Sequence, residues 1–232
     1  MTTVSEKCRI DAAKELWPVF WGLVGTKAAL LWDELVKAYS EPHRAYHNLV
    51  HLQQMLHAIH PYKQVLQDWE GVLLALFYHD VVYDPAASDN EAQSAKWACE
   101  RLDKLVPPTT LNLCEALILA TATHQHHNEE TFNLFIGADL AILGSTCPEY
   151  LHYAQAIRRE YARYPDKHYR DSRMTVLHRF LDRDRIFYAE SFFCRYEAIA
   201  RKNLSQEWAY WKTKSDAIHY KRQFLHNSRL NL

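Results

Sequence analysis

The pattern of apolar and polar positions along the chain predicts helices almost throughout. Apolar residues recur at intervals of three and four, with polar residues between them, as in helices that bury one face. Proline, glycine and capping residues divide the pattern into segments. We expect two helices within residues 9–39, and further helices or short helical stretches at about 46–60, 69–80, 88–106, 110–125, 131–143, 149–164, 171–181, 184–203 and 205–225.

Local signals place several of these boundaries. Pro18 and the stretch from Gly22 to Gly25 disturb the first helix, and Pro61 stops the helix that precedes it. Residues 88–91 (Ser-Asp-Asn-Glu) have the Ser-x-x-Glu form of a capping box, which predicts the start of the helix reaching about Val106. The chain has no internal repeat and no flexible linker, so we expect one all-α unit over residues 1–232.

Composition and charge narrow the classes of function. Only 5 of the 232 residues are glycine, which argues against a loop-rich β fold, and the net charge is −1. Acidic residues interrupt basic stretches such as 158–160 and 182–185, and no basic stripe is present, so nucleic acid is not the expected partner. The polar N-terminus and the lack of a long apolar run predict a cytoplasmic protein without a membrane span. Five scattered cysteines suggest neither a disulfide framework nor a thiolate zinc site, and the oligomeric state stays open.

Four ionisable residues in apolar surroundings are candidate metal ligands. His79 and Asp80 end the apolar run Ala-Leu-Phe-Tyr-His-Asp, and Asp139 lies within an apolar stretch. Burying such groups is costly unless a partner compensates them, and a divalent cation is a common partner. His47 and His51 are four residues apart, so a helix over 46–60 would project both rings from one face. The alternative for these two is a pair of polar histidines near a helix start.

The order of these residues resembles a known family. Tyr46-His47-Asn48-Leu49-Val50-His51, the His79-Asp80 pair and a lone Asp139 are similar to the His…His-Asp…Asp signature of the HD superfamily of metal-dependent phosphohydrolases. The Tyr-His-Asn-x-x-His form resembles the cyclic-nucleotide phosphodiesterase branch. The motifs at 46–51, 79–85, 90–91 and 138–144 are closer to a bacterial group known only as predicted HD-superfamily phosphohydrolases, and residues 157–161 with Arg173 extend the likeness.

This resemblance implies a fold and a set of roles. The fold would be an HD-domain-like helical bundle, with the motifs in a core of about residues 39–145, additional N-terminal helices and a helical C-terminal part of about 148–226. His51, His79, Asp80 and Asp139 would ligate a metal, and Asp80 would also orient the attacking water. His47 matches the histidine that protonates the leaving oxygen in the phosphodiesterase branch. Tyr83 replaces a histidine of that branch and its Pro-Gly turn is absent, which argues against cyclic nucleotides as substrates.

The ligand types fit this chemistry. A mixed imidazole and carboxylate set suits Mn²⁺, Mg²⁺, Co²⁺, Zn²⁺ or Fe²⁺, and four protein ligands leave two positions of a six-coordinate ion for water and substrate. Such an ion turns water into a nucleophile near neutral pH and polarises a phosphoryl oxygen.

Other polar residues are candidates for the surrounding pocket. His124 could bind a second metal, whereas a solvated histidine-rich helix end would equally explain His124, His126 and His127. Arg158 and Arg173 could clamp a phosphate, because a guanidinium matches phosphate oxygens bidentately, or they could pair with Glu160 and Asp171. The remaining candidates for the pocket lining are Tyr83, Asn90 and Glu91.

The sequence therefore predicts an enzyme that hydrolyses a phosphate ester or anhydride in a small, nucleotide-like substrate with a divalent metal. One alternative is an HD-fold di-iron oxygenase, which would need His124 and one further histidine as ligands. A second alternative is a binding module whose metal only stabilises the fold.

Overall fold

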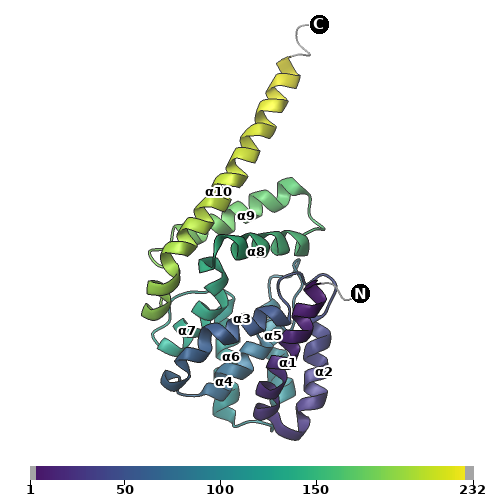
Figure 1. Ribbon diagram of the computed structural model, residues 1–232, viewed down its shortest axis with the longest axis vertical. Coiled ribbons are helices and arrows are strands. Elements are labelled where there is room, and N and C mark those ends of the chain that lie inside the picture. The colour runs from purple at the N-terminus through teal and green to yellow at the C-terminus, as the bar shows by residue number, and fades with distance from the viewer. Residues whose placement is uncertain (1–3, 228–232) are drawn as a thin grey trace.

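The computed structural model describes residues 4–227, with side chains from residue 6 to residue 213. This range contains α-helices and short 3-10 helices and no strand, which confirms the all-α class (Figure 1). The elements are α1 (Val4–Val24), η1 (Gly25–Lys27), α2 (Ala28–Tyr39), α3 (Leu49–Ile59), η2 (His60–Val65), α4 (Trp69–Tyr78), α5 (Asn90–Leu102), α6 (Pro108–Thr121), α7 (Glu130–Leu140), η3 (Ala141–Gly144), α8 (Cys147–Glu160), α9 (Asp166–Leu181) and α10 (Glu190–Asn227).

Most helix boundaries lie close to the expected positions. The predicted break within 9–39 falls at Gly25, whose φ of 55° is a conformation that glycine adopts without steric cost. Pro18, in contrast, lies inside α1. Asp68 caps α4, because its side chain accepts a hydrogen bond from the backbone N–H of Gly71.

Four predicted helix starts are wrong: α9 begins at Asp166 rather than at residue 171, α10 begins at Glu190 rather than at residue 184, and the other two lie nearer the site. The third helix begins at Leu49 rather than at residue 46, because Asn48 caps it by accepting from the N–H of Val50. His47 therefore precedes the helix. The capping box at 88–91 does not form: α5 starts at Asn90 without a side-chain cap, and the Asn90 amide instead bonds the backbone N–H and C=O of Asp84.

The C-terminal region also lacks a predicted helix break. Two helices were expected on either side of residue 204, but α10 runs unbroken through it. The amide of buried Asn203 donates to the carbonyls of Leu143 and Ser145. Asn203 thus joins α10 to η3 instead of marking a helix end.

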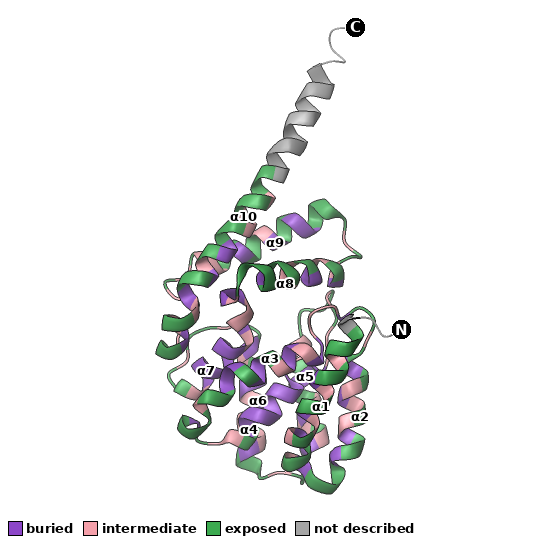
Figure 2. Ribbon diagram, in the orientation of Figure 1, coloured by how far each residue is buried: buried purple, intermediate pink, exposed green. Residues whose placement is uncertain are grey.

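The helices form a bundle with a smaller layer beside it. We call α1–α7 with η1–η3 the floor, and α8 with α9 the roof (Figure 1). One apolar core extends from Ala12 in α1 to Leu204 in α10. Buried residues dominate α4 and α7 in the floor, whereas the roof helices are buried only in part (Figure 2). In α4 every residue from 71 to 78 is buried, so its C-terminus delivers His79 and Asp80 into the interior.

Helix α10 holds the roof to the floor. It packs along α9 and along η3, the short segment that follows Asp139. A Cβ at Gly144 would lie 2.6 Å from the Cβ of Tyr196, so glycine permits this close approach. None of the described helices has the length and apolarity that a membrane span requires.

Candidate metal centre and cavity

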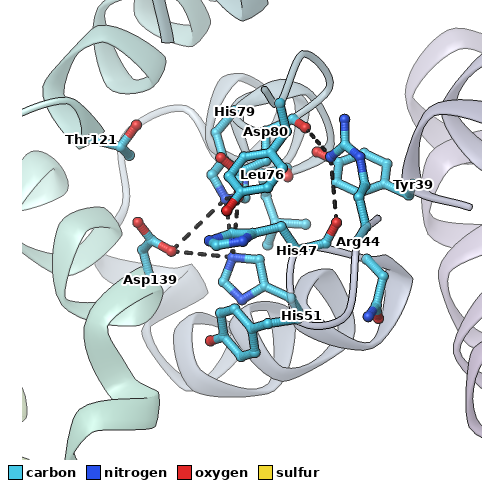
Figure 3. A network of polar contacts seen from close by, with 12 residues as sticks. Tyr39, Arg44, His47, His51, Leu76, His79, Asp80, Thr121 and Asp139 are labelled. Atoms are coloured by element: carbon cyan, nitrogen blue, oxygen red, sulfur yellow. Dashed lines mark hydrogen bonds and ion pairs between the residues drawn. The ribbon is translucent and has the colours of Figure 1, made fainter. Parts of the chain in front are cut away.

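Donor atoms from three helices converge between α3, α4 and α7. The Nε2 atoms of His51 and His79 lie 3.1 Å apart, and His51 Nε2 lies 3.2 Å from an Asp139 carboxylate oxygen (Figure 3). An Asp80 carboxylate oxygen is 3.1 Å from His79 Nε2 and 3.7 Å from His51 Nε2. The structure thus brings together the four residues expected as metal ligands.

The local structure explains why these atoms point at one another. His51 lies in the first turn of α3 and His79 directly follows the last residue of α4. The Nδ1 of His79 bonds the carbonyl of Leu76 at 2.9 Å, which directs Nε2 towards the cluster. Asp139 is in the last turn of α7, and α3 packs against both α4 and α7.

The donor set fits a divalent metal ion. Ligand atoms about 2.1 Å from one ion and at right angles lie about 3.0 Å apart, close to the three shortest separations here. Donors of His51, His79 and Asp139 all lie within 4.8 Å of one another, and no other group of three or more such residues occurs among the described side chains. Asp80 lies beside this group as a possible fourth ligand. Two imidazoles and a carboxylate could therefore hold a metal, whose identity the donor types leave open.

Burial and mutual attraction shift the protonation of the cluster in opposite directions. Burial alone would lower the pKa of His79, but Asp80 and Asp139 outweigh it and raise the pKa to about 9. Burial would raise the pKa of both carboxyl groups, yet the neighbouring histidines hold both pKa values below their usual range. Without a metal the cluster thus retains a proton, which a metal must displace.

A buried arginine that sequence reasoning missed fixes the backbone around the cluster. Arg44 is completely buried and donates to the carbonyls of Asp80, at 2.6 Å, and Val81, at 2.9 Å (Figure 3). It also pairs with Glu41. Because Arg44 uses the carbonyl of Asp80, the carboxylate of Asp80 remains free for the cluster. Its position just before the first motif gave no sequence signal that distinguishes it from a surface arginine.

His47 lies beside the metal donors and is held by the roof. Its Nδ1 is 2.7 Å from Oε2 of Glu160, which also accepts a hydrogen bond from the hydroxyl of Tyr83. The other carboxylate oxygen, Oε1, accepts from the backbone N–H groups of Tyr46 and His47. Burial opposes protonation of His47, but the negative charges of Asp80 and Glu160 prevail and raise its pKa. The pKa of Glu160 falls to about 2 although burial alone would raise it. Glu160 was considered only as a partner of arginine in the sequence, so this contact was missed.

His124 touches the cluster from the other side. Its Nε2 is 2.7 Å from the second carboxylate oxygen of Asp139, and its backbone has a φ of 50°, which is unusual for a residue other than glycine. Arg183 donates to the carbonyls of Thr123 and His124 and so holds this turn. His126 and His127 point elsewhere: they pack on Tyr188 and Phe132.

A cavity of about 700 Å³ opens over the cluster between the floor and the roof. Asp80, Asp139, His47 and His124 line it from the floor. Of the residues expected to bind substrate, the structure places Tyr83, Asn90, Glu91 and Arg173 on the cavity wall.

Arg158 lies elsewhere. It bonds the carbonyls of Tyr161 and Tyr164 and the carboxylate of Asp166, which corrects its expected place in the pocket. Arg173 lines the cavity, yet it forms a bidentate pair with Glu207 in α10. Neither Glu160 nor Asp171, the partners considered for these arginines, pairs with them; Asp171 pairs with Arg170.

Comparison with known proteins adds no relative: no protein-family model matches the chain, and no significant match was found among curated proteins or solved structures.

Proposed function

We propose that this protein is a metal-dependent phosphohydrolase that cleaves a phosphate ester or anhydride in a small, nucleotide-like substrate. The observation that carries the proposal is the position of His47. This histidine sits next to a cluster of metal-binding donors, lines the same cavity and is backed by a buried carboxylate. A metal-binding cluster alone would also suit a structural role, but it would not need a polarised histidine facing an open cavity.

His47 is the proposed general acid. Glu160 occupies its Nδ1, which leaves Nε2 as the nitrogen available to a substrate. The same carboxylate stabilises the protonated ring, so that the ring carries a proton to the leaving oxygen when the bond to phosphorus breaks. Tyr83 donates to Glu160 and thereby fixes the carboxylate in place.

The metal donors would supply the remaining chemistry. A divalent ion held by His51, His79 and Asp139, with Asp80 beside them, provides Lewis acidity that polarises a phosphoryl oxygen and acidifies water near neutral pH. Asp80 lines the cavity as well as touching His79, so its carboxylate can accept a hydrogen bond from the attacking water.

The test is a screen of the protein loaded separately with Mn²⁺, Mg²⁺, Co²⁺, Zn²⁺ or Fe²⁺ against phosphate monoesters, diesters and nucleotides. We expect phosphate release that depends on the metal and is lost in Asp139→Asn. Hydrolysis that persists in Asp139→Asn would point to a contaminating enzyme. Oxygen uptake by the iron-loaded protein together with no hydrolysis under any metal would overturn the proposal in favour of an oxygenase.

A further inference from the structure

Helix α9 turns one continuous face towards the cavity. Its lining residues recur every three or four positions, as one side of a helix does: His168, Ser172, Val176, Arg179 and Phe180 are among them. At a rise of 1.5 Å per residue, the stretch from 168 to 180 is about 18 Å long. A single phosphate group is much smaller than this face, so the cavity has room for a longer ligand.

The arginines on the roof side of the cavity differ in their hydrogen-bond partners within the protein. Both side-chain hydrogen bonds of Arg173 go to the carboxylate of Glu207, at 2.8 and 2.9 Å, and both side chains are only 8% exposed. Arg183, just beyond the end of α9, donates hydrogen bonds from two guanidinium nitrogens to the carbonyls of Thr123 and His124. An anion would have to compete with these partners for either arginine.

Arg179 is different. It lines the cavity and is exposed, and within the described part of the chain it has neither a hydrogen bond nor an ion pair. It does not pair with Asp80 or Asp139, although both carboxylates line the same cavity. Its guanidinium therefore lies beyond ion-pair distance of both carboxylates and can bind an anion without breaking a hydrogen bond or an ion pair within the described part of the chain.

We propose that Arg179 binds a second anionic group of the substrate, distant from the phosphate at the metal donors. This inference rests on the proposed function, because the first anion is the phosphate to be cleaved. It narrows the substrate to compounds with two separated anionic groups. Condensed phosphates and phosphate compounds that carry a carboxylate share this chemistry, and a guanidinium recognises either.

The experiment measures binding of four probes to the Mn²⁺-loaded protein by calorimetry: orthophosphate, pyrophosphate, tripolyphosphate and phosphonoacetate. The variant is Arg179→Gln. Arg159→Gln is the matched control, because Arg159 is also exposed on the roof and lacks a partner among the described residues, but does not line the cavity. All three proteins keep the metal donors, and the metal content measured after each titration corrects for any metal that a probe withdraws.

Arg179→Gln should weaken binding of at least one probe with two anionic groups by about tenfold or more, the usual effect of a charged hydrogen bond. Orthophosphate should change by less than about twofold, and Arg159→Gln should change nothing. Preference for tripolyphosphate or for phosphonoacetate would then identify a phosphate or a carboxylate as the second group. Equal weakening of orthophosphate, or no weakening of any probe, would overturn the subsite.

The result also separates this inference from the proposed function. If no phosphate ester is hydrolysed but Arg179→Gln still discriminates among the probes, the anion subsite stands and the hydrolase proposal fails. If esters are hydrolysed and the probes do not discriminate, only the subsite fails.

Discussion

The floor and the roof contain buried charges that are satisfied in opposite ways. Arg173 in the roof forms a bidentate pair with Glu207 in α10, and this pair is complete within the protein. In the floor, the donor atoms of His51, His79 and Asp139 point at one another. The nearby Arg44 bonds the backbone carbonyl of Asp80 and not its carboxylate. A complete pair has no need of a ligand, whereas converging donors become satisfied by a cation. The Arg173–Glu207 pair thus stabilises the structure, whereas the converging donors of the floor could hold a metal ion.

The sharpest test of this comparison replaces the two histidines of the first motif one at a time, because they are expected to have different roles. His51→Ala should lose metal, because it removes a donor of the cluster. His47→Ala should keep metal but lose about 10²–10⁴-fold in turnover, the usual worth of a general acid. Elemental analysis and steady-state rates measure the two effects.

Substrates with different leaving groups provide the control for the role of His47. Nitrophenolate departs without a proton, so the loss caused by His47→Ala should shrink for nitrophenyl esters. Equal losses for activated and unactivated esters, or loss of metal from His47→Ala, would show that His47 is not the general acid.

The second test concerns Glu160, where the roof touches the floor. Its folded pKa of about 2 lies below the ordinary value of 4.5, so the carboxylate stabilises the fold above pH 4.5 and that stability is lost as the pH falls towards 2. The shift corresponds to about 3 kcal/mol. Glu160→Gln should therefore lower the free energy of unfolding at pH 7 by about this amount, because an amide cannot accept all four hydrogen bonds that the carboxylate accepts.

Urea unfolding at pH 7 and at pH 3 measures the effect of Glu160→Gln. The difference from the native sequence should shrink at the lower pH. Glu190→Gln is the control, since Glu190 is exposed and pairs with Arg185 at the surface, where little change is expected. A difference for Glu160→Gln that does not depend on pH would contradict an ionised carboxylate at this position.

These two sites also show what the sequence could predict. The metal donors are adjacent to apolar helical runs, so their convergence followed from pattern and family resemblance. Glu160 and His47 are 113 positions apart, and the periodicity of α8 gives no indication that one of its last residues reaches the first motif. Arg158 bonds neighbours in sequence up to Asp166 and does not reach the cavity. Arg173 lines the cavity as expected, but its partner Glu207 lies in α10, and local sequence does not reveal this tertiary contact.

Helix starts near the site failed for a related reason. The pattern at 46–60 is helical, but Glu160 accepts the backbone N–H groups of Tyr46 and His47, and Asn48 begins the helix after them. A tertiary contact thus overrides a local preference. The consequence is functional, because His47 reaches the cavity from a turn rather than from the first turn of a helix.

The third test concerns the proton that His79 carries in the floor and its effect on metal binding. The folded pKa of His79 is about 9, raised from 6.5, so below pH 9 a metal must displace a proton. Metal affinity should therefore rise by about tenfold per pH unit from pH 7 towards pH 9, about 100-fold in all, and level off above pH 9. Calorimetry in two buffers with different ionisation enthalpies should detect about one proton released per metal at pH 7. A metal affinity that does not change with pH would show that His79 is neutral before the metal binds.

The fourth test, with the smallest expected effect, concerns Arg183. It asks whether this arginine, on the roof side of the cavity, influences metal binding in the floor. Its guanidinium holds the carbonyls of Thr123 and His124, and His124 in turn bonds Asp139. The positive φ of His124 costs energy of the order of 1 kcal/mol, which these hydrogen bonds offset. Arg183→Gln should thus release the turn and weaken metal binding by about three- to tenfold, less than the loss of a direct hydrogen bond to a ligand.

Arg179→Gln is the matched control for this test, because it removes the same charge from the same cavity wall without touching the His124 turn. If Arg183 acts only through its charge, its removal should raise metal affinity. If it positions His124, its removal should lower metal affinity. Removing a positive charge from the wall of the cavity that also contains Asp80 and Asp139 should tighten metal binding slightly, and this is the result expected for Arg179→Gln. Arg183→Gln should weaken binding only if the arginine positions His124. Tighter binding in both variants, measured by calorimetry with Mn²⁺, would mean that Arg183 contributes only its charge and that the roof side does not position the metal donors.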